Sequence, residues 1–138
     1  MKLNIFCEEV ESPQIKKSLI LDICKKISTV ENIIFSDINI IFCSDDYLLN
    51  INKEYLQHDY YTDIITFDYK NQKSVSSDIF ISLDRVLENA QSVSVDFDHE
   101  LKRIIIHGLL HLSGYEDDTL EKRKNMSIRE DYFLAKLL

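Results

Sequence analysis

The spacing of apolar residues constrains this 138-residue chain most, because it changes repeatedly between a strand period of two and a helix period of about 3.6. Residues 3–7 alternate apolar and polar side chains, which predicts a strand. Apolar residues then recur at every fourth position from Ile15 to Ile27, which predicts a helix. Ser12 and Pro13 stand just ahead of this series as a helix cap and a first-turn proline. The chain therefore begins as a strand followed by a helix.

The same criterion predicts the rest of the chain. The further elements are a strand at 38–43, a helix at about 46–56, a hairpin of short strands at 64–67 and 79–81, and helices at 83–93, at 96 or 98 to about 113, and at about 119–137. This order predicts the α+β class, with a small mixed four-stranded sheet covered by about five helices. No repeat or linker interrupts it, so we expect one domain over 1–138.

The charge of the chain limits what it can bind. It has 24 acidic and 16 basic residues, a formal net charge of −8. Because nonspecific binding of nucleic acids depends on basic residues that neutralise phosphates, this composition argues against a broadly basic RNA- or DNA-binding protein. Residues 36–100 hold 13 acidic and 4 basic side chains. We therefore expect any binding to naked nucleic acid to be weak and salt-sensitive.

Cysteine content and hydropathy indicate a compartment. Cys7, Cys24 and Cys43 are an odd number of cysteines without a C-x-x-C pair, which favours free thiols in a reducing environment. The N-terminus turns acidic too early for a signal peptide, and no apolar stretch is long enough to span a membrane. We expect a cytoplasmic protein.

Two histidines on the predicted helix before residue 113 suggest metal chemistry. His107 and His111 stand four residues apart, so both imidazoles lie on one helix face and can ligate the same ion. Gly114 can end the helix in a left-handed conformation and return the chain toward the histidines. The next acidic residues, at 116–118, offer a third ligand. Solvated histidines and a solvated acidic loop or helix cap are the alternatives.

These residues resemble a known family. Residues 107–117, His-Gly-Leu-Leu-His-Leu-Ser-Gly-Tyr-Glu-Asp, are similar to the H-G-x-L-H-L-x-G-Y-D-H signature of the YbeY family of metal-dependent endoribonucleases. Residues 52–67 are similar to the family's N-x-x-Y and P-T-D-V-L-S-F segments. Residues 77–79 resemble its G-D-I, and Met126 with Glu130 its C-terminal M-x-x-x-E.

The resemblance implies one Zn²⁺ per chain, or another divalent metal, held by His107, His111 and the residue at the third position. That residue is Asp117, where most members have histidine, while Glu116 and Asp118 are alternatives. Two histidines and a carboxylate form a known catalytic zinc set. The carboxylate lowers the net charge of the site and adds a hard oxygen ligand, which weakens Lewis acidity and broadens the choice of metal.

The resemblance also implies an activity. It predicts a single-strand-specific endoribonuclease of rRNA processing, which acts in late 16S rRNA 3′-end maturation and in ribosome quality control. Its partners would be ribosomal RNA and the small ribosomal subunit, and metal-activated water would perform the hydrolysis. His107, His111 and Asp117 would be catalytic through the metal.

One departure concerns RNA contact. The family commonly has an arginine after the tyrosine of N-x-x-Y, but Leu56 occupies that position here and we expect it to pack in the core. Lys53, His58 and Arg103 are candidates to replace the arginine, with Arg103 one helical turn before His107.

Two other functions compete with RNA cleavage. A non-catalytic, ribosome-associated factor with a structural metal would fit the missing arginine and the changed third ligand. A metallopeptidase would need a glutamate after the first histidine as its general base, and Gly108 occupies that position. Tyr55, Tyr60 and Tyr61 can stack on bases, or they can pack half-buried.

Overall fold

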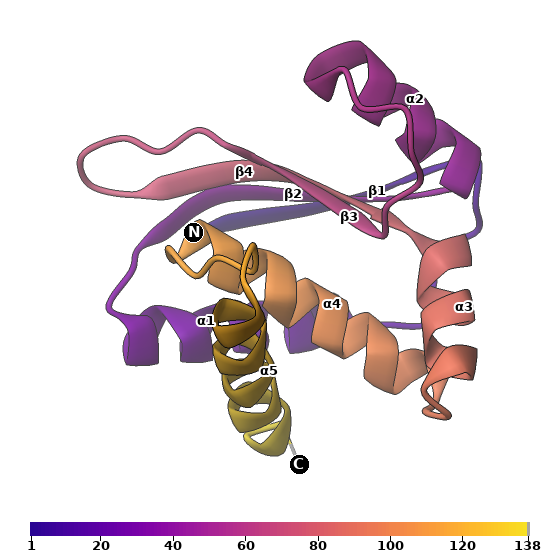
Figure 1. Ribbon diagram of the computed structural model, residues 1–138. Coiled ribbons are helices and arrows are strands. Elements are labelled where there is room, and N and C mark those ends of the chain that lie inside the picture. Colours follow the sequence, from indigo (N-terminus) through magenta and orange to yellow (C-terminus); the bar gives the residue numbers. More distant parts are fainter. Residues whose placement is uncertain (138) are drawn as a thin grey trace.

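A computed structural model describes residues 1–137, which form a mixed sheet and surrounding helices (Figure 1). The elements are, in chain order, β1 (Lys2–Glu8), α1 (Lys17–Glu31), β2 (Phe35–Cys43), α2 (Asp45–Leu56), β3 (Ile64–Asp68), β4 (Val75–Ser82), α3 (Leu83–Ser92), α4 (Phe97–Leu112) and α5 (Leu120–Ala135). The predicted order of strands and helices and the α+β class are confirmed.

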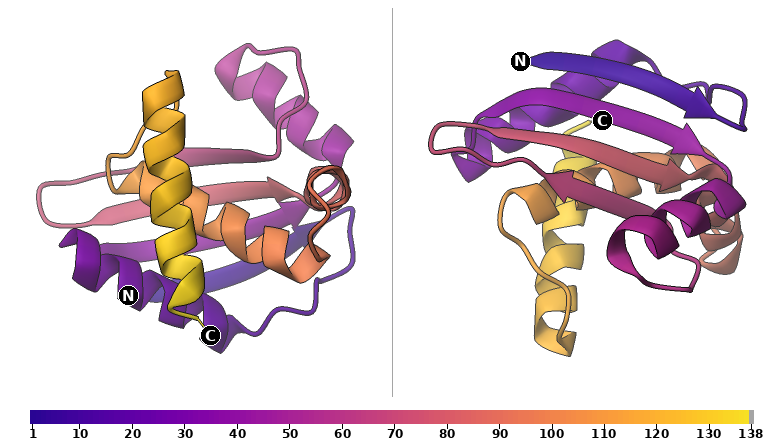
Figure 2. Two further views of the ribbon diagram at one scale, coloured as in Figure 1. Left: turned by 60° about the horizontal axis from the view of Figure 1, so that its bottom comes forward. Right: turned by 90° about the horizontal axis from the view of Figure 1, so that it is seen from above.

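The sheet has the strand order β1-β2-β4-β3, which is seen from above in Figure 2. The first three of these strands run parallel, and β3 pairs with β4 as the antiparallel arm of the predicted hairpin. The register aligns Ile5, Ile40 and Ile79 across the sheet. Because side chains alternate between the faces of a strand, this row and its i±2 neighbours form one apolar face.

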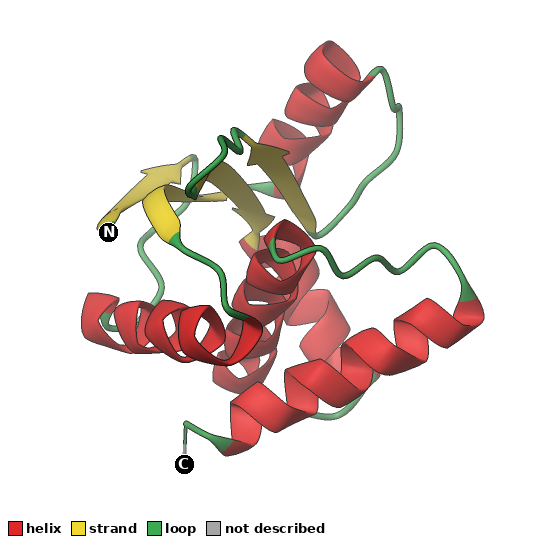
Figure 3. Ribbon diagram, turned by 90° about the vertical axis from the view of Figure 1, so that its left-hand side faces the viewer, coloured by secondary structure: helices red, strands yellow, loops and turns green. Residues whose placement is uncertain are grey.

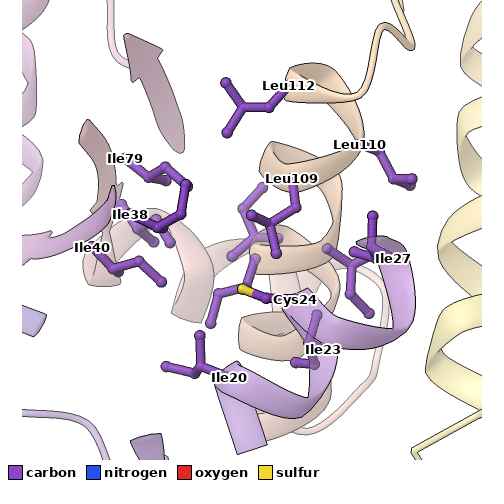
Figure 4. Close-up of a cluster of buried hydrophobic side chains, with 14 of the residues drawn as sticks. Ile20, Ile23, Cys24, Ile27, Ile38, Ile40, Ile79, Leu109, Leu110 and Leu112 are labelled. Atoms are coloured by element: carbon purple, nitrogen blue, oxygen red, sulfur yellow. The ribbon is translucent and has the colours of Figure 1, made fainter. Parts of the chain in front are cut away.

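Helices α1, α4 and α5 lie on that face of the sheet, whereas α2 lies on the other side, as Figures 1 and 3 show. The core is formed where α1 and α4 meet the strands, and Figure 4 shows this cluster. Its labelled members include Ile23 and Ile27 of α1, Leu109 of α4, and Ile40 and Ile79 of the sheet, all at most 1% exposed.

Helix α4 lies at the centre of the fold and is buried on almost every side. We expected a single core-facing stripe that contains Leu101, Ile105 and Leu109, yet Ile104 and Ile106 are equally buried. The reason is that α1, α3, α5 and the sheet all pack against α4. Its C-terminal half, with the two histidines, lines a groove at the surface.

The start of α1 differs from the prediction. The helix begins at Lys17 and not at the Ser12-Pro13 cap. The Ile15 amide donates to the Pro13 carbonyl at 2.9 Å, which closes a tight turn before the helix. Helix α2 is capped by Ser44, whose side chain accepts a hydrogen bond from the Tyr47 amide at 3.1 Å.

Across residues 1–137, no helix combines the length and the apolar content that crossing a membrane requires.

Candidate metal centre

The C-terminal half of α4 presents two histidines side by side. His107 and His111 are one turn apart, so their rings lie edge to face with centroids 4.5 Å apart. Their Nε2 atoms are separated by 3.0 Å. The side chains are 15% and 26% exposed, so both rings are held by the protein and still open to the groove.

The loop after α4 brings a carboxylate to the histidines. Gly114 has φ = 105°, a conformation that favours glycine, and its Cβ position faces open space, so conformation and not crowding requires glycine here. Asp117 Oδ2 lies 3.4 Å from Nε2 of His107 and of His111. Ligand atoms of these three residues all lie within 4.8 Å of one another, so the group could hold a metal ion.

The two neighbouring carboxylates pair with a lysine and not with the histidines. Lys122 on α5 binds Glu116 at 2.7 Å and Asp118 at 3.2 Å. Both acidic side chains are about two-thirds exposed. For these two residues the alternative of a solvated acidic loop therefore holds. Of the three acidic residues at 116–118, Asp117 alone meets the histidines in the described structure.

The Nδ1 atoms determine the form of each imidazole. His111 Nδ1 lies 2.9 Å from the Tyr115 carbonyl oxygen, which can only accept, so Nδ1 carries the proton. His107 Nδ1 lies 2.5 Å from Glu130 Oε2, and a carboxylate imposes the same tautomer. In the neutral form of each ring the lone pair is therefore on Nε2, the atom that faces the other Nε2 and Asp117. Two lone pairs and a carboxylate converge favourably only around a cation, so the residues present fit a metal ion.

Glu130 is itself held by a buried ionic network. Arg103 Nη1 donates to Glu130 Oε1 at 3.0 Å, and Arg103 Nε donates to Glu100 at 2.7 Å. The side chains of Glu100 and Glu130 are only 3% and 4% exposed. Hydrogen bonding to Glu100 and the charge of Glu130 raise the pKa of Arg103 above its ordinary value. The permanently charged guanidinium thus keeps both buried carboxylates paired.

Gly108 lets α4 approach the sheet closely. A Cβ at this position would lie 2.7 Å from Ile64 Cδ1 of β3 and 3.5 Å from Thr66 Cγ2. The glycine after the first histidine therefore has a packing role, and the position holds no general base. The two glycines of the chain serve different purposes, one in packing and one in the turn that carries Asp117 to the site.

The site opens into a groove of about 630 Å³ between the β3 edge, the loop after α2 and the loop after α4. Leu56 lines this groove and is 41% exposed, so the expectation that it packs in the core is wrong: α2 ends at this residue and leaves its side chain at the rim. Among the candidates to replace the family arginine, His58 lines the groove. Lys53 pairs with Asp59 at 3.4 Å, and Arg103 faces the buried network beneath the site.

The three tyrosines near the groove have different surroundings. Tyr55 contacts Phe67 edge to face, and Tyr61 donates to Asp46 at 3.1 Å. Tyr60 lines the groove and is 56% exposed. The exposed fractions of Tyr55, Tyr60 and Tyr61 are 60%, 56% and 48%, so each ring is about half buried, as in the packing alternative.

Sequence reasoning missed the roles of Glu130 and Glu100, although a signal for Glu130 was present. The buried residues of α5 are Met126, Glu130 and Phe133, spaced four and three apart. A glutamate inside an apolar helix stripe must find a partner, because an unpaired buried charge is costly. Such a residue marks a buried network even before its partners are known.

Comparisons with known proteins show to which family the chain is similar. The family model described as Endoribonuclease YbeY matches residues 5–138. The protein named Endoribonuclease YbeY from Parabacteroides distasonis is 44% identical over 135 residues, which cover 98% of this chain and 95% of the relative. Its namesake from Cytophaga hutchinsonii is 51% identical over 100 residues, or 72% of this chain and 70% of the relative.

The fold has a counterpart among solved structures. A solution structure of a Thermotoga maritima protein superposes with a TM-score of 0.63 at 25% identity, and the match covers 98% of this chain and 88% of that one. Together with the match of the family model over almost the full length, these similarities show that the chain belongs to the YbeY family of endoribonucleases, hydrolases that act on RNA.

Proposed function

We propose that this chain is a metal-dependent endoribonuclease that cuts single-stranded ribosomal RNA, with residues 1–138 acting as one domain. The observation that carries the proposal is the convergence of His107, His111 and Asp117 in a groove of about 630 Å³. The names of the relatives supply the substrate class.

The proposed centre holds one divalent ion, zinc in the first instance, through Nε2 of each histidine and a carboxylate oxygen of Asp117. When bound, such an ion supplies Lewis acidity toward a phosphate oxygen and lowers the pKa of a water molecule. The protein contributes the orientation of its ligands: Glu130 fixes the His107 ring and the Tyr115 carbonyl fixes the His111 ring. Arg103 acts in this proposal as a positioning residue that holds Glu130 in place.

The proposed cellular role is late maturation of the 16S rRNA 3′ end and ribosome quality control in the cytoplasm, with the small ribosomal subunit as partner. The acidic composition supports a substrate presented by such an assembly, because 24 acidic against 16 basic residues favour no general affinity for RNA.

The test combines metal analysis with RNA cleavage. His107→Ala, His111→Ala and Asp117→Ala should each lose bound metal and cleavage of a 16S precursor together. Glu116→Ala is the matched control, because this neighbouring carboxylate faces Lys122 and not the histidines. Wild-type cleavage by a metal-free histidine variant would overturn the proposed mechanism.

A non-catalytic factor with a structural metal is the second candidate, and Asp117 in place of the usual histidine is the observation that favours it. The same experiment separates the two functions. Stoichiometric metal in the wild-type protein without cleavage of the precursor would support the structural role. The peptidase alternative is disfavoured because Gly108 packs against β3 where such an enzyme needs its glutamate.

A further inference from the structure

An exposed pair of aromatic rings lies in the groove that contains the candidate metal centre. His58 and Tyr60 belong to the loop between α2 and β3, and both line the groove with His107 and His111. Their rings are stacked, with centroids 5.1 Å apart and planes 19° from parallel. Tyr60 is 56% exposed, so the pair presents open ring surface to the groove.

The loop that carries the pair is fixed from within the protein. Asn52 of α2 is only 2% exposed, and its side-chain amide donates to the Tyr60 carbonyl at 2.9 Å. The His58 amide donates to the Asn52 carbonyl at 3.1 Å. A hydrogen bond of 3.0 Å joins the Tyr60 hydroxyl to His58 Nδ1. The two rings are therefore held in place without a ligand, which lowers the entropic cost of binding one.

The charge of the groove shows which forces can hold RNA there. The residues that line it include one lysine, Lys70, and four carboxylates, those of Asp63, Asp68, Glu116 and Asp117. Most single-strand binding sites attract the phosphates with a basic groove, and this groove lacks that charge. Stacking on an aromatic ring needs no positive charge, because every base has a π face. The aromatic pair is thus the feature of the groove suited to hold a nucleotide.

We propose that the His58–Tyr60 pair is a nucleobase-stacking subsite, which holds an unpaired base of single-stranded RNA beside the metal centre. This inference rests on the proposed RNA cleavage and specifies how its substrate is held. Bases inside a duplex are already stacked on their neighbours and cannot reach a protein ring, so the subsite selects unpaired nucleotides. It also gives a non-ionic alternative to the family arginine that Leu56 replaces.

The test measures binding in the presence of a chelator, so that the RNA stays intact. The probes are a fluorescent adenine oligoribonucleotide and an abasic ribose-phosphate oligomer of equal length, each followed by anisotropy. The variants are Tyr60→Ala and Tyr60→Phe, and Tyr69→Ala is the matched control. Tyr69 is 56% exposed, like Tyr60, and its replacement by alanine also removes one hydrogen bond, the one to Asp78. Tyr69 does not line the groove.

Wild-type protein should bind the base-containing probe more tightly than the abasic probe. Tyr60→Ala should weaken binding of the base-containing probe by about five- to a hundredfold and leave the abasic probe unaffected. Tyr60→Phe should retain most of the affinity, and Tyr69→Ala should match the wild type. The ratio of wild-type to Tyr60→Ala affinity should be equal at low and high salt, because stacking is not screened.

Equal binding of both probes by the wild type, or equal affinities of Tyr60→Ala and Tyr69→Ala for the adenine probe, would overturn the subsite. Cleavage of RNA by the metal-loaded wild type is measured in parallel. If the protein cleaves RNA but binds both probes equally, the subsite is refuted and the proposed function stands. If the protein shows base-dependent binding but cleaves no RNA when loaded with any divalent metal, the proposed function alone is refuted.

Discussion

Replacing Glu130 by glutamine should weaken metal binding although the side chain keeps its size. In the wild type, two donors converge on this carboxylate: Arg103 Nη1–H meets Oε1 and His107 Nδ1–H meets Oε2. Glutamine has one oxygen and one NH₂ group in place of these two oxygens, so one of the two donors meets an NH₂ group that cannot accept. The permanently charged arginine takes the oxygen, and the NH₂ group is left to donate to His107 Nδ1.

That exchange reverses the histidine tautomer. A ring that accepts at Nδ1 carries its proton on Nε2, the atom that faces His111 and Asp117. The ring must then lose or relocate this proton before it can ligate a metal. Removal of an oriented carboxylate behind a ligating histidine typically weakens metal affinity by about 10- to 100-fold, which is about 1.4–2.7 kcal/mol.

Glu100→Gln is the matched control for this effect. Glu100 is equally buried, it binds the same arginine, and the substitution removes the same charge, but Glu100 makes no hydrogen bond to His107. Both variants should lose stability, by about 1.5–3 kcal/mol for a charged hydrogen bond, in denaturant titrations. Only Glu130→Gln should lose metal affinity in competition with a chromophoric chelator.

Nitrogen NMR of the metal-free protein reads the tautomer directly. The His107 ring should carry its proton on Nδ1 in the wild type and in Glu100→Gln, and on Nε2 in Glu130→Gln. The reasoning is refuted if the two variants bind metal equally well, or if the His107 tautomer stays the same in both.

Three further substitutions or treatments follow from the backbone and the core. Gly114→Ala places a side chain at φ = 105° and should cost about 1–3 kcal/mol in urea unfolding, with weaker metal binding as the turn shifts; unchanged stability would contradict this. Gly108→Ala should cost about 1–3 kcal/mol from overpacking against β3, offset by about 1 kcal/mol of helix propensity, so the melting temperature should fall only slightly. Burial raises the pKa of the Cys24 and Cys43 thiols from 9.0 to about 12, so their neutral forms stabilise the fold fully below pH 9. That contribution is lost as the pH rises from 9 toward 12; alkaline unfolding should follow this window, and mass spectrometry should find both thiols unmodified by alkylating reagents at neutral pH.

The elements of the fold could be predicted from local patterns, but their surroundings could not. The four-residue spacing of His107 and His111 determines that they share a face, whatever the rest of the chain does. Ile104 and Ile106 are buried in a helix on which α1, α3 and α5 pack as well as the sheet, and α1 and α5 come from distant parts of the sequence. Hydrophobic periodicity describes one covered face and therefore underestimates a helix covered on several sides.

The third ligand shows the same division between local and long-range information. The sequence placed three acidic residues after the Gly114 turn and favoured Asp117 by resemblance. The structure separates them through Lys122, which binds Glu116 and Asp118 from the following helix. His107 and Glu130 are 23 residues apart in the sequence, and they meet only because α5 docks on α4. No local sequence pattern encodes that docking.

The position of Glu130 on α5 has a consequence for the timing of synthesis. The histidines and Asp117 leave the ribosome before residues 120–135, and His107 gains its orienting carboxylate only when α5 has been made and has docked on α4. A nascent chain that lacks this helix has its candidate metal ligands but not the carboxylate that orients His107.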